Sequence, residues 1–211
     1  MTAALLTLAD SRLPAGGHTH SGGAEQAIAA GVVRDPATLS AFLVRRLVTS
    51  GAVAAGLAAA ACAATDAEEL ARLDGEADAR TPSPALRAAS RQQGRGLVRV
   101  GRRAWPSARW DALPDRPHHP VALGVAAAAA GLGPQDAAAA AAYLSVSGPA
   151  TAAQRLLAMD PLTVAGLTAR LAPEVDAVAV RATGALPADT DPLLDLLAEV
   201  HAARKDRFFA S

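Results

Sequence analysis

Residues Ala137 to Gln154 read AAAAAAYLSVSGPATAAQ, a stretch without a charged residue in which nine of the eighteen positions are alanine. Alanine has the highest helix propensity of all residues, and its side chain buries little area. The whole chain shares this bias, since 57 of its 211 residues are alanine and only 3% are aromatic. We therefore predict an all-α protein whose helices pack closely through small side chains.

Two further uncharged stretches, Leu47 to Thr65 and Pro117 to Gln135, are also long enough to cross a bilayer. All three stretches consist mainly of Ala and Gly, with Ser, Thr or Pro between them. They lack the density of Leu, Ile and Phe that favours membrane insertion. We expect buried helices and no membrane partner.

The charge balance and the single cysteine exclude several classes of protein. Lys and Arg together number 20, as do Asp and Glu, so the chain has no basic excess with which to bind nucleic acid. Cys62 is the only cysteine, which rules out a disulfide framework and a cysteine-rich zinc site. No charged segment precedes an apolar one at the N-terminus, so we expect a cytoplasmic protein.

Prolines that follow capping residues mark the predicted helix starts. Asp35-Pro36, the capping box Thr65 to Glu68, and either Thr81-Pro82 or Ser83-Pro84 open helices. No segment alternates with period two and β-branched enrichment, so we predict about eight to ten helices and no sheet. Later helices are expected to start near Pro120, Pro134, Pro149, Pro161, Pro173 and Pro192, and helices to end near Gly31, Gly131 and Gly184.

The helices are expected to form one compact domain over residues 1–211. The least regular region is 105–119, which is rich in proline and holds both tryptophans, Trp105 and Trp110. We predict that it is a mobile surface loop between an N-terminal and a C-terminal group of helices. Because this connection is short and unlike a linker in composition, both groups should share one core.

The segment from Leu8 to Glu25 reads LADSRLPAGGHTHSGGAE and gathers glycine, histidine, serine and a carboxylate. It lacks the Lys-Ser/Thr of a phosphate-binding loop. His18 and His20 could be metal ligands, with Glu25 or the pair His118-His119 completing the site. Alternatively, the segment is a glycine-rich turn in which Ser21 caps the next helix and the histidines are exposed or hydrogen-bonded.

The end of the chain, residues 201–211, reads HAARKDRFFAS and places Phe208 and Phe209 beside Arg207. The two phenylalanines either fold back onto the core or form an exposed tail that docks into a partner, since Arg and aromatic residues are enriched at interface hot spots. No serine stands in a nucleophile motif with a supporting strand–turn–helix context, and Cys62 lies in an apolar helix. We predict no catalytic residue.

These segments resemble the urease accessory protein UreF family. Leu13-Pro-Ala-Gly-Gly-x-Thr-His-Ser-x-Gly-x-Glu25 is similar to the family's opening signature, and His201…Arg207-Phe208-Phe209-x-Ser211 is similar to its C-terminal one. Tyr143-Leu-Ser with Arg155-Leu-Leu is similar to a block between them. The chain departs from the pattern at His18, at Ala24 and at Asp160-Pro161.

The resemblance implies an all-helical chaperone without catalytic activity or a cofactor. Family members assemble with a second accessory protein, UreD (also called UreH), and recruit the GTPase UreG. The complex delivers nickel to apo-urease, and family members pair as homodimers within it. Two alternatives from other classes are a helical nickel-binding protein that uses His18 and His20, and a helical scaffold unrelated to urease.

The resemblance also implies which residues meet partners. The N-terminal block would organise the backbone next to the surface that recruits the GTPase, and the tail would become ordered when the UreD-type partner binds. Arg155 and Arg207 would make charge-assisted contacts, with an arginine finger as the alternative role of Arg207. The expected partner-binding residues are Gly16, Gly17, His18, His20, Ser21, Gly22, Glu25, Arg155, Arg207, Phe208, Phe209 and Ser211.

Overall fold

The computed structural model describes residues 3–10, 13 and 19–211, so Gly16, Gly17 and His18 of the expected site lie outside the described residues. Every regular element in these ranges is a helix, which confirms the all-α prediction there. A π-helical turn, Leu47–Gly51, joins α3 and α4 into one continuous helix, and a 3-10 turn spans Ala108–Ala112. The α-helices are α1 (Ala3–Ala9), α2 (Ala24–Ala29), α3 (Pro36–Arg46), α4 (Ala52–Ala63), α5 (Ala67–Ala79), α6 (Pro84–Ala104), α7 (His119–Ala129), α8 (Pro134–Leu156), α9 (Pro161–Ala182) and α10 (Pro192–Ala203).

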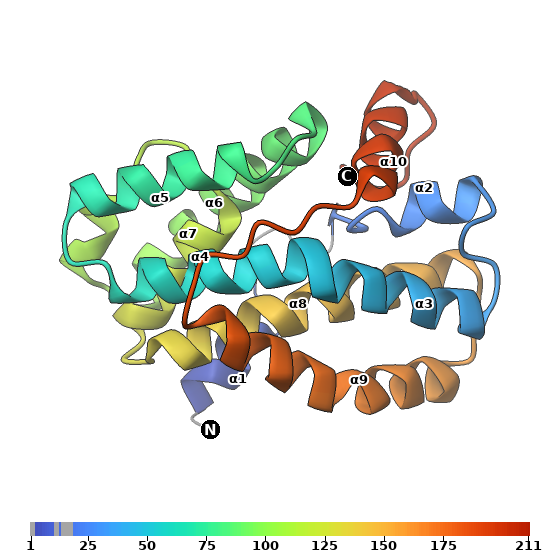
Figure 1. Cartoon of the computed structure of the whole chain (residues 1–211), viewed down its shortest axis with the longest axis horizontal. Coiled ribbons are helices and arrows are strands. Elements are labelled where there is room, and N and C mark those ends of the chain that lie inside the picture. The colour runs from blue at the N-terminus through green and yellow to red at the C-terminus, as the bar shows by residue number, and fades with distance from the viewer. Residues whose placement is uncertain (1–2, 11–12, 14–18) are drawn as a thin grey trace.

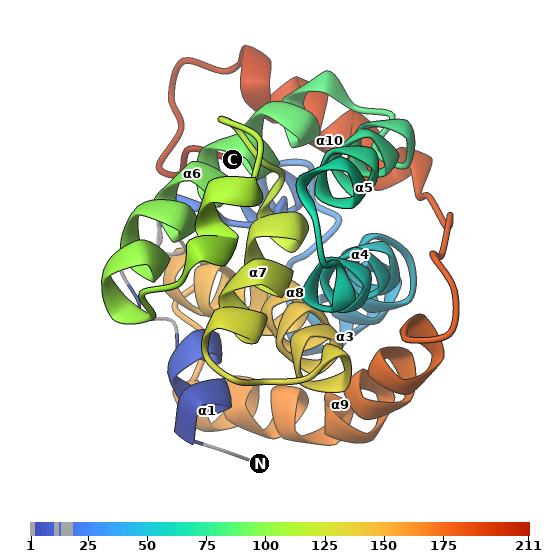
Figure 2. The same ribbon diagram turned by 90° about the vertical axis from the view of Figure 1, so that its left-hand side faces the viewer.

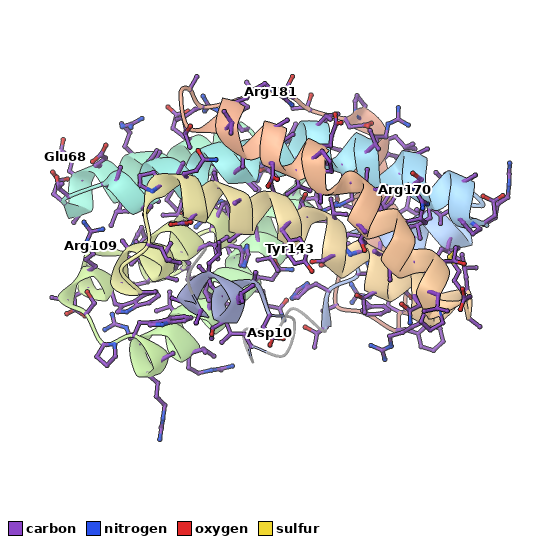
Figure 3. All side chains as sticks on the ribbon, turned by 90° about the horizontal axis from the view of Figure 1, so that it is seen from below. Asp10, Glu68, Arg109, Tyr143, Arg170 and Arg181 are labelled. Atoms are coloured by element: carbon purple, nitrogen blue, oxygen red, sulfur yellow. The ribbon has the colours of Figure 1, made fainter. Side chains whose placement is uncertain are left out.

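The centre of the molecule is α4, which packs against α7, α8, α9 and α5. Figure 1 shows the continuous α3–α4 helix running across the molecule, and Figure 2 shows it nearly end-on among its neighbours. Within the described ranges, Pro36–Ala63 is the one helix long and apolar enough to cross a membrane, and 56% of its most apolar window is buried inside the molecule. Figure 3 shows Arg170 and Arg181 of α9 on the outside of the bundle, where both are exposed.

Small side chains allow the central helices to approach closely. A Cβ atom added at Gly124 of α7 would lie 2.4 Å from the carbonyl oxygen of Ala58 and 2.7 Å from the Cβ of Ala61, both on α4. Side chains from all of the described helices belong to one contiguous apolar cluster. The alanine-rich stretches are therefore core helices, as the composition predicts.

Local capping explains most helix starts. Asp35 accepts a hydrogen bond from Thr38 N in a capping box, and Ser83, Asp160 and Asp191 cap α6, α9 and α10, each followed by a proline at the first helical position. The predicted box at Thr65 is displaced by one residue. Asp66 caps α5 instead, because its extended backbone lets its carboxylate accept from Glu69 N.

The prediction that Pro149 and Pro173 stand near helix starts is wrong, because both lie inside helices, in α8 and α9. A proline has no N–H for the carbonyl four residues earlier, and such a helix persists only where that carbonyl finds another donor or water. For Pro149 the carbonyl belongs to Ser145, and Arg46 Nε donates to it at 3.2 Å. For Pro173 it belongs to Ala169, an exposed residue.

The region predicted to be an irregular surface loop, 105–119, contains the 3-10 turn Ala108–Ala112, and two of its side chains, Trp110 and His118, are buried. Trp110 is 1% exposed and its ring covers Gly101 of α6, where a Cβ would lie 2.3 Å from the ring. Trp110 Nε1 donates to the carbonyl of Trp105 at 2.9 Å. At the other end, buried His118 donates its backbone N–H to Asp74 of α5 at 2.7 Å.

Candidate functional site

The C-terminal tail meets the segment that leads into α2. α10 packs against α2 and α6, and the residues after α10 return to the segment that leads into α2, with the C-terminus beside α10 in Figure 1. Ala210 N donates to the carbonyl of Thr19 at 2.6 Å, and Ser21 N donates to the carbonyl of Ser211 at 2.5 Å. We call residues 19–25 together with 201–211 the chain-end junction.

The carboxylate of Glu25, in the first turn of α2, lies at the centre of the chain-end junction and is 4% exposed. Its Oε1 accepts from Phe208 N at 2.9 Å, and its Oε2 accepts from Phe209 N at 2.9 Å. The Nε2 of buried His201 lies 3.0 Å from Oε2. One buried carboxylate therefore holds both the tail backbone and the end of α10.

These contacts set the charge state of Glu25. Burial alone would raise the pKa of the carboxyl group, but the hydrogen bonds from His201 and from the Phe208 and Phe209 amides outweigh it and hold the pKa below its usual range. Glu25 is thus ionised at neutral pH. The stabilisation from its ionised form is present above the ordinary glutamate pKa and is lost as the pH falls through the lowered value.

We expect this linkage to be visible when the wild type is compared with Glu25→Gln. The difference in their free energies of unfolding should be constant from about pH 8 to about pH 5 and should shrink below about pH 4, since an unperturbed glutamate titrates near about 4.3. Urea unfolding at a series of pH values measures the difference. A difference that changes most between about pH 6 and 8 would instead assign the linkage to a histidine.

Ser21 does not cap α2 in the way the sequence predicts. The N-cap position is held by Gly23, whose positive φ of 87° follows a φ of 59° at Gly22, and no side chain caps it. The buried Ser21 hydroxyl donates to the carbonyl of Ser211 at 2.9 Å and accepts weakly from Glu25 N at 3.3 Å. His20 Nδ1 lies 2.5 Å from the hydroxyl of Ser211. Both side chains therefore secure the tail.

The two tail phenylalanines have different surroundings, so each reading of the sequence applies to one of them. Phe209 packs against the core, and the guanidinium of Arg155 lies 5.8 Å from its ring centroid, within range for a cation–π contact. Phe208 is 85% exposed, and its neighbour Arg207 is also exposed. In this structure Glu25, His20 and Ser21 bind the tail, and the ordering of the tail in the isolated chain stays a prediction to be tested.

Sequence reasoning missed His201 as a site residue. It also missed the contact of Arg204 with Gln26, in which Nη1 of Arg204 lies 3.0 Å from Oε1 of Gln26. A signal for His201 was present. It falls on the buried face of α10 that Leu194 and Leu197 define, and a polar residue in such an apolar stripe needs a buried partner. The partner itself, Glu25, is 176 residues away along the chain.

His118 is engaged in structural contacts. The Nδ1 atom of His118 lies 3.0 Å from the Ser90 hydroxyl, and its Nε2 atom lies 2.9 Å from Oδ1 of Asp78. These two contacts link the start of α7 to α6 and α5. Within the described ranges, no three His, Cys, Asp or Glu side chains are grouped so that they could hold a metal ion. Cys62 is buried in α4, where burial raises the pKa of its thiol.

The fold and the chain-end junction together define an all-helical protein that presents an exposed aromatic side chain on a tail fixed at its backbone. A UreF family model matches residues 33–172. The chain belongs to the UreF family.

Relatives named urease accessory protein UreF match nearly the whole chain. The protein of Mycobacterium sp. (strain JLS) is 55% identical over 98% of this chain and 97% of its own. The protein of Mycolicibacterium vanbaalenii is 53% identical over 99% of this chain and 98% of its own. The protein of Mycobacterium tuberculosis (strain ATCC 25618 / H37Rv) is 50% identical over 99% of this chain and 98% of its own. This membership removes the alternative of a helical scaffold unrelated to urease.

Proposed function

We propose that this protein is a non-enzymatic chaperone of urease maturation that acts in the cytoplasm. It assembles with a UreD-type accessory protein, also called UreH, and recruits the GTPase UreG, so that nickel, the cargo of the complex, reaches apo-urease. It works as a homodimer within that complex. Membership of the UreF family and the resemblance of both chain ends to the family signatures support this proposal.

The observation that carries the proposal is the combination of an exposed ring and a fixed backbone at Phe208. The ring is 85% exposed, while its own N–H is bound to buried Glu25. A large aromatic side chain on a preorganised backbone loses little conformational entropy when a partner covers it. The tail therefore suits a pocket on the UreD-type protein, with Arg207 available for a charge-assisted contact beside it.

The other expected residues serve the same surface in this proposal. His20, Ser21, Gly22 and Glu25 shape the turn that receives the tail. Gly16, Gly17 and His18, which lie outside the described residues, are proposed to take part in recruiting the GTPase. Arg155 holds Phe209 through its cation–π contact. This contact fixes the residue next to Phe208, whose ring is exposed. Ser211 secures the end of the tail through His20 and Ser21.

Co-expression with tagged UreD and untagged UreG of the same organism tests the proposal. Phe208→Ala removes the exposed ring but keeps the backbone N–H that Glu25 accepts, so the tail stays docked. We expect this variant to be captured at least about tenfold less well than the wild type, as for an interface hot spot. The matched control is Leu162→Ala, because Leu162 is 81% exposed on α9, outside the chain-end junction.

Equal capture of Phe208→Ala and the wild type would move the interface away from the tail. Failure of the folded wild-type chain to capture either partner would overturn the proposed function itself. Deletion of residues 207–211 adds a stronger version of the test, since it also removes the backbone donors to Glu25.

A further inference from the structure

A cavity of about 460 Å³ lies beside the chain-end junction. Its wall includes three nitrogen-bearing side chains that no ion pair in the described part of the chain neutralises: Arg46 at the end of α3, His20 before α2, and His119 at the start of α7. His20 also holds the tail through Ser211, but the docking of the tail does not explain Arg46 or His119.

Arg46 is the central residue of this wall. Its Nε donates to the carbonyl of Ser145, the carbonyl that Pro149 leaves without a helical donor, at 3.2 Å. Its two terminal nitrogens have no hydrogen-bond acceptor and no carboxylate partner among the described residues. The adjacent Arg45, by contrast, is paired with Asp191. The contact with Ser145 thus fixes the guanidinium and leaves its outer edge open to the cavity.

Arg46 is half-buried, so its guanidinium is partly removed from water while it lacks a partner. Burial lowers the pKa of Arg46 to about 10, so the guanidinium remains charged at neutral pH. A desolvated charge without a counterion is unfavourable, and proteins normally pair it. An anion that enters the cavity would supply the missing counterion.

The two histidines add hydrogen-bonding nitrogens around the same space. His20 uses Nδ1 for Ser211, which leaves Nε2 free for a ligand. The imidazole of His119 has no hydrogen-bond partner in the described ranges, and burial together with the nearby His20 lowers its pKa to about 4. Both rings are therefore neutral when the cavity holds no anion, and each can present an N–H to an oxygen atom.

The backbone around Arg46 keeps the cavity open. A Cβ at Gly22 would lie 2.7 Å from Cγ of Pro149 and 3.4 Å from Nη2 of Arg46, so any larger residue there would crowd the guanidinium. The π-helical turn Leu47–Gly51 starts directly after Arg46. Such turns inside α-helices often occur at functional sites.

We propose that this cavity binds a small oxyanion, with the guanidinium of Arg46 as its main ligand and His20 and His119 as hydrogen-bond donors. A guanidinium binds two oxygens of one planar group at once, which matches bicarbonate, a free carboxylate or phosphate. The cavity wall also carries Asp189, Asp191 and Asp195. Arg80, Arg155 and Arg207 line the cavity as well, so its wall holds charges of both signs, and the carboxylates weigh against a doubly charged anion.

Calorimetric titration of the full-length chain tests the site, with sodium bicarbonate, sodium acetate and sodium phosphate as probes and total ionic strength held constant with sodium chloride. We expect saturable binding of bicarbonate or acetate, weaker binding of phosphate, and a loss of affinity of at least about tenfold in Arg46→Gln, or about 1.4 kcal/mol. Arg95→Gln is the matched control, because Arg95 is exposed on α6 and does not line the cavity.

His119→Gln gives a second variant in case Arg46→Gln does not fold, and it should weaken binding without removing the guanidinium. Circular dichroism and urea unfolding confirm that each variant is folded. Absence of saturable binding to the wild type, or equal binding by Arg46→Gln, would overturn the proposal. If no small anion binds but Arg46→Gln weakens capture by UreD or UreG, then Arg46 pairs with an acidic side chain of a partner, and the small-anion site is refuted.

Discussion

Replacement of Glu25 by alanine is expected to lower the free energy of unfolding by about 3 to 5 kcal/mol and to release the tail from α2. The carboxylate is buried and accepts from His201 and from two backbone amides, so its removal leaves three buried or partly buried donors without an acceptor. Urea unfolding measures the change. The matched control is Glu174→Ala on α9, an exposed glutamate whose replacement should change stability by less than about 0.5 kcal/mol.

Glu25→Gln separates charge from shape at the same position. The amide keeps one acceptor oxygen but turns an N–H₂ group toward a donor, so we expect a smaller loss of stability than in Glu25→Ala. A result in which Glu25→Ala is no less stable than Glu174→Ala would mean that the tail is not held by this carboxylate. The contacts of Glu25 would then contribute nothing to the stability of the fold.

Introduction of valine at Gly124 is expected to be the most damaging change in the core, with a loss of at least about 3 kcal/mol. The Cβ alone would lie 2.4 Å from the carbonyl oxygen of Ala58 and 2.7 Å from the backbone nitrogen of Cys62. Because these are backbone atoms, α4 and α7 must separate to accommodate the side chain. Thermal or urea unfolding of the purified variant measures the loss, and failure to obtain folded protein is its extreme form.

Gly75→Ala in α5 is the control for Gly124→Val, because a Cβ at Gly75 would meet no atom within 4 Å. Alanine is the better helix former, so this variant should gain about 0.5 to 1 kcal/mol. If Gly124→Val were as stable as the wild type, α4 and α7 would not approach each other through small residues. The explanation of the alanine-rich composition by close helix packing would then be wrong.

The parts of the fold that were predicted correctly depend on neighbours in the sequence. Asp35, Ser83, Asp160 and Asp191 cap helices through atoms two or three residues away, so a capping residue followed by a proline is a sufficient signal. Pro149 could not be placed in this way. The donor that compensates for its missing N–H, Arg46, lies 99 residues from Ser145.

The same distinction applies to the chain-end junction. The residue types at His20, Ser21, Glu25 and Ser211 carry the resemblance to the family, but no pattern in either segment predicts that they bind each other. The sequence left open whether the two phenylalanines pack on the core or are exposed. In the structure Phe209 is packed and Phe208 is exposed. Both backbone amides reach Glu25, and the packed ring lies beside Arg155, which is far away along the chain, so local spacing does not encode the division.

The most direct test of the account is amide hydrogen exchange on the isolated full-length chain, followed at Phe208, Phe209 and Ser21. These amides are bound to Glu25 and to the carbonyl of Ser211, so we predict slow exchange at all three in the wild type. The Phe208 and Phe209 amides should become unprotected in Glu25→Ala. Exchange of the wild-type tail amides at the rate of an unstructured peptide would contradict a preformed chain-end junction.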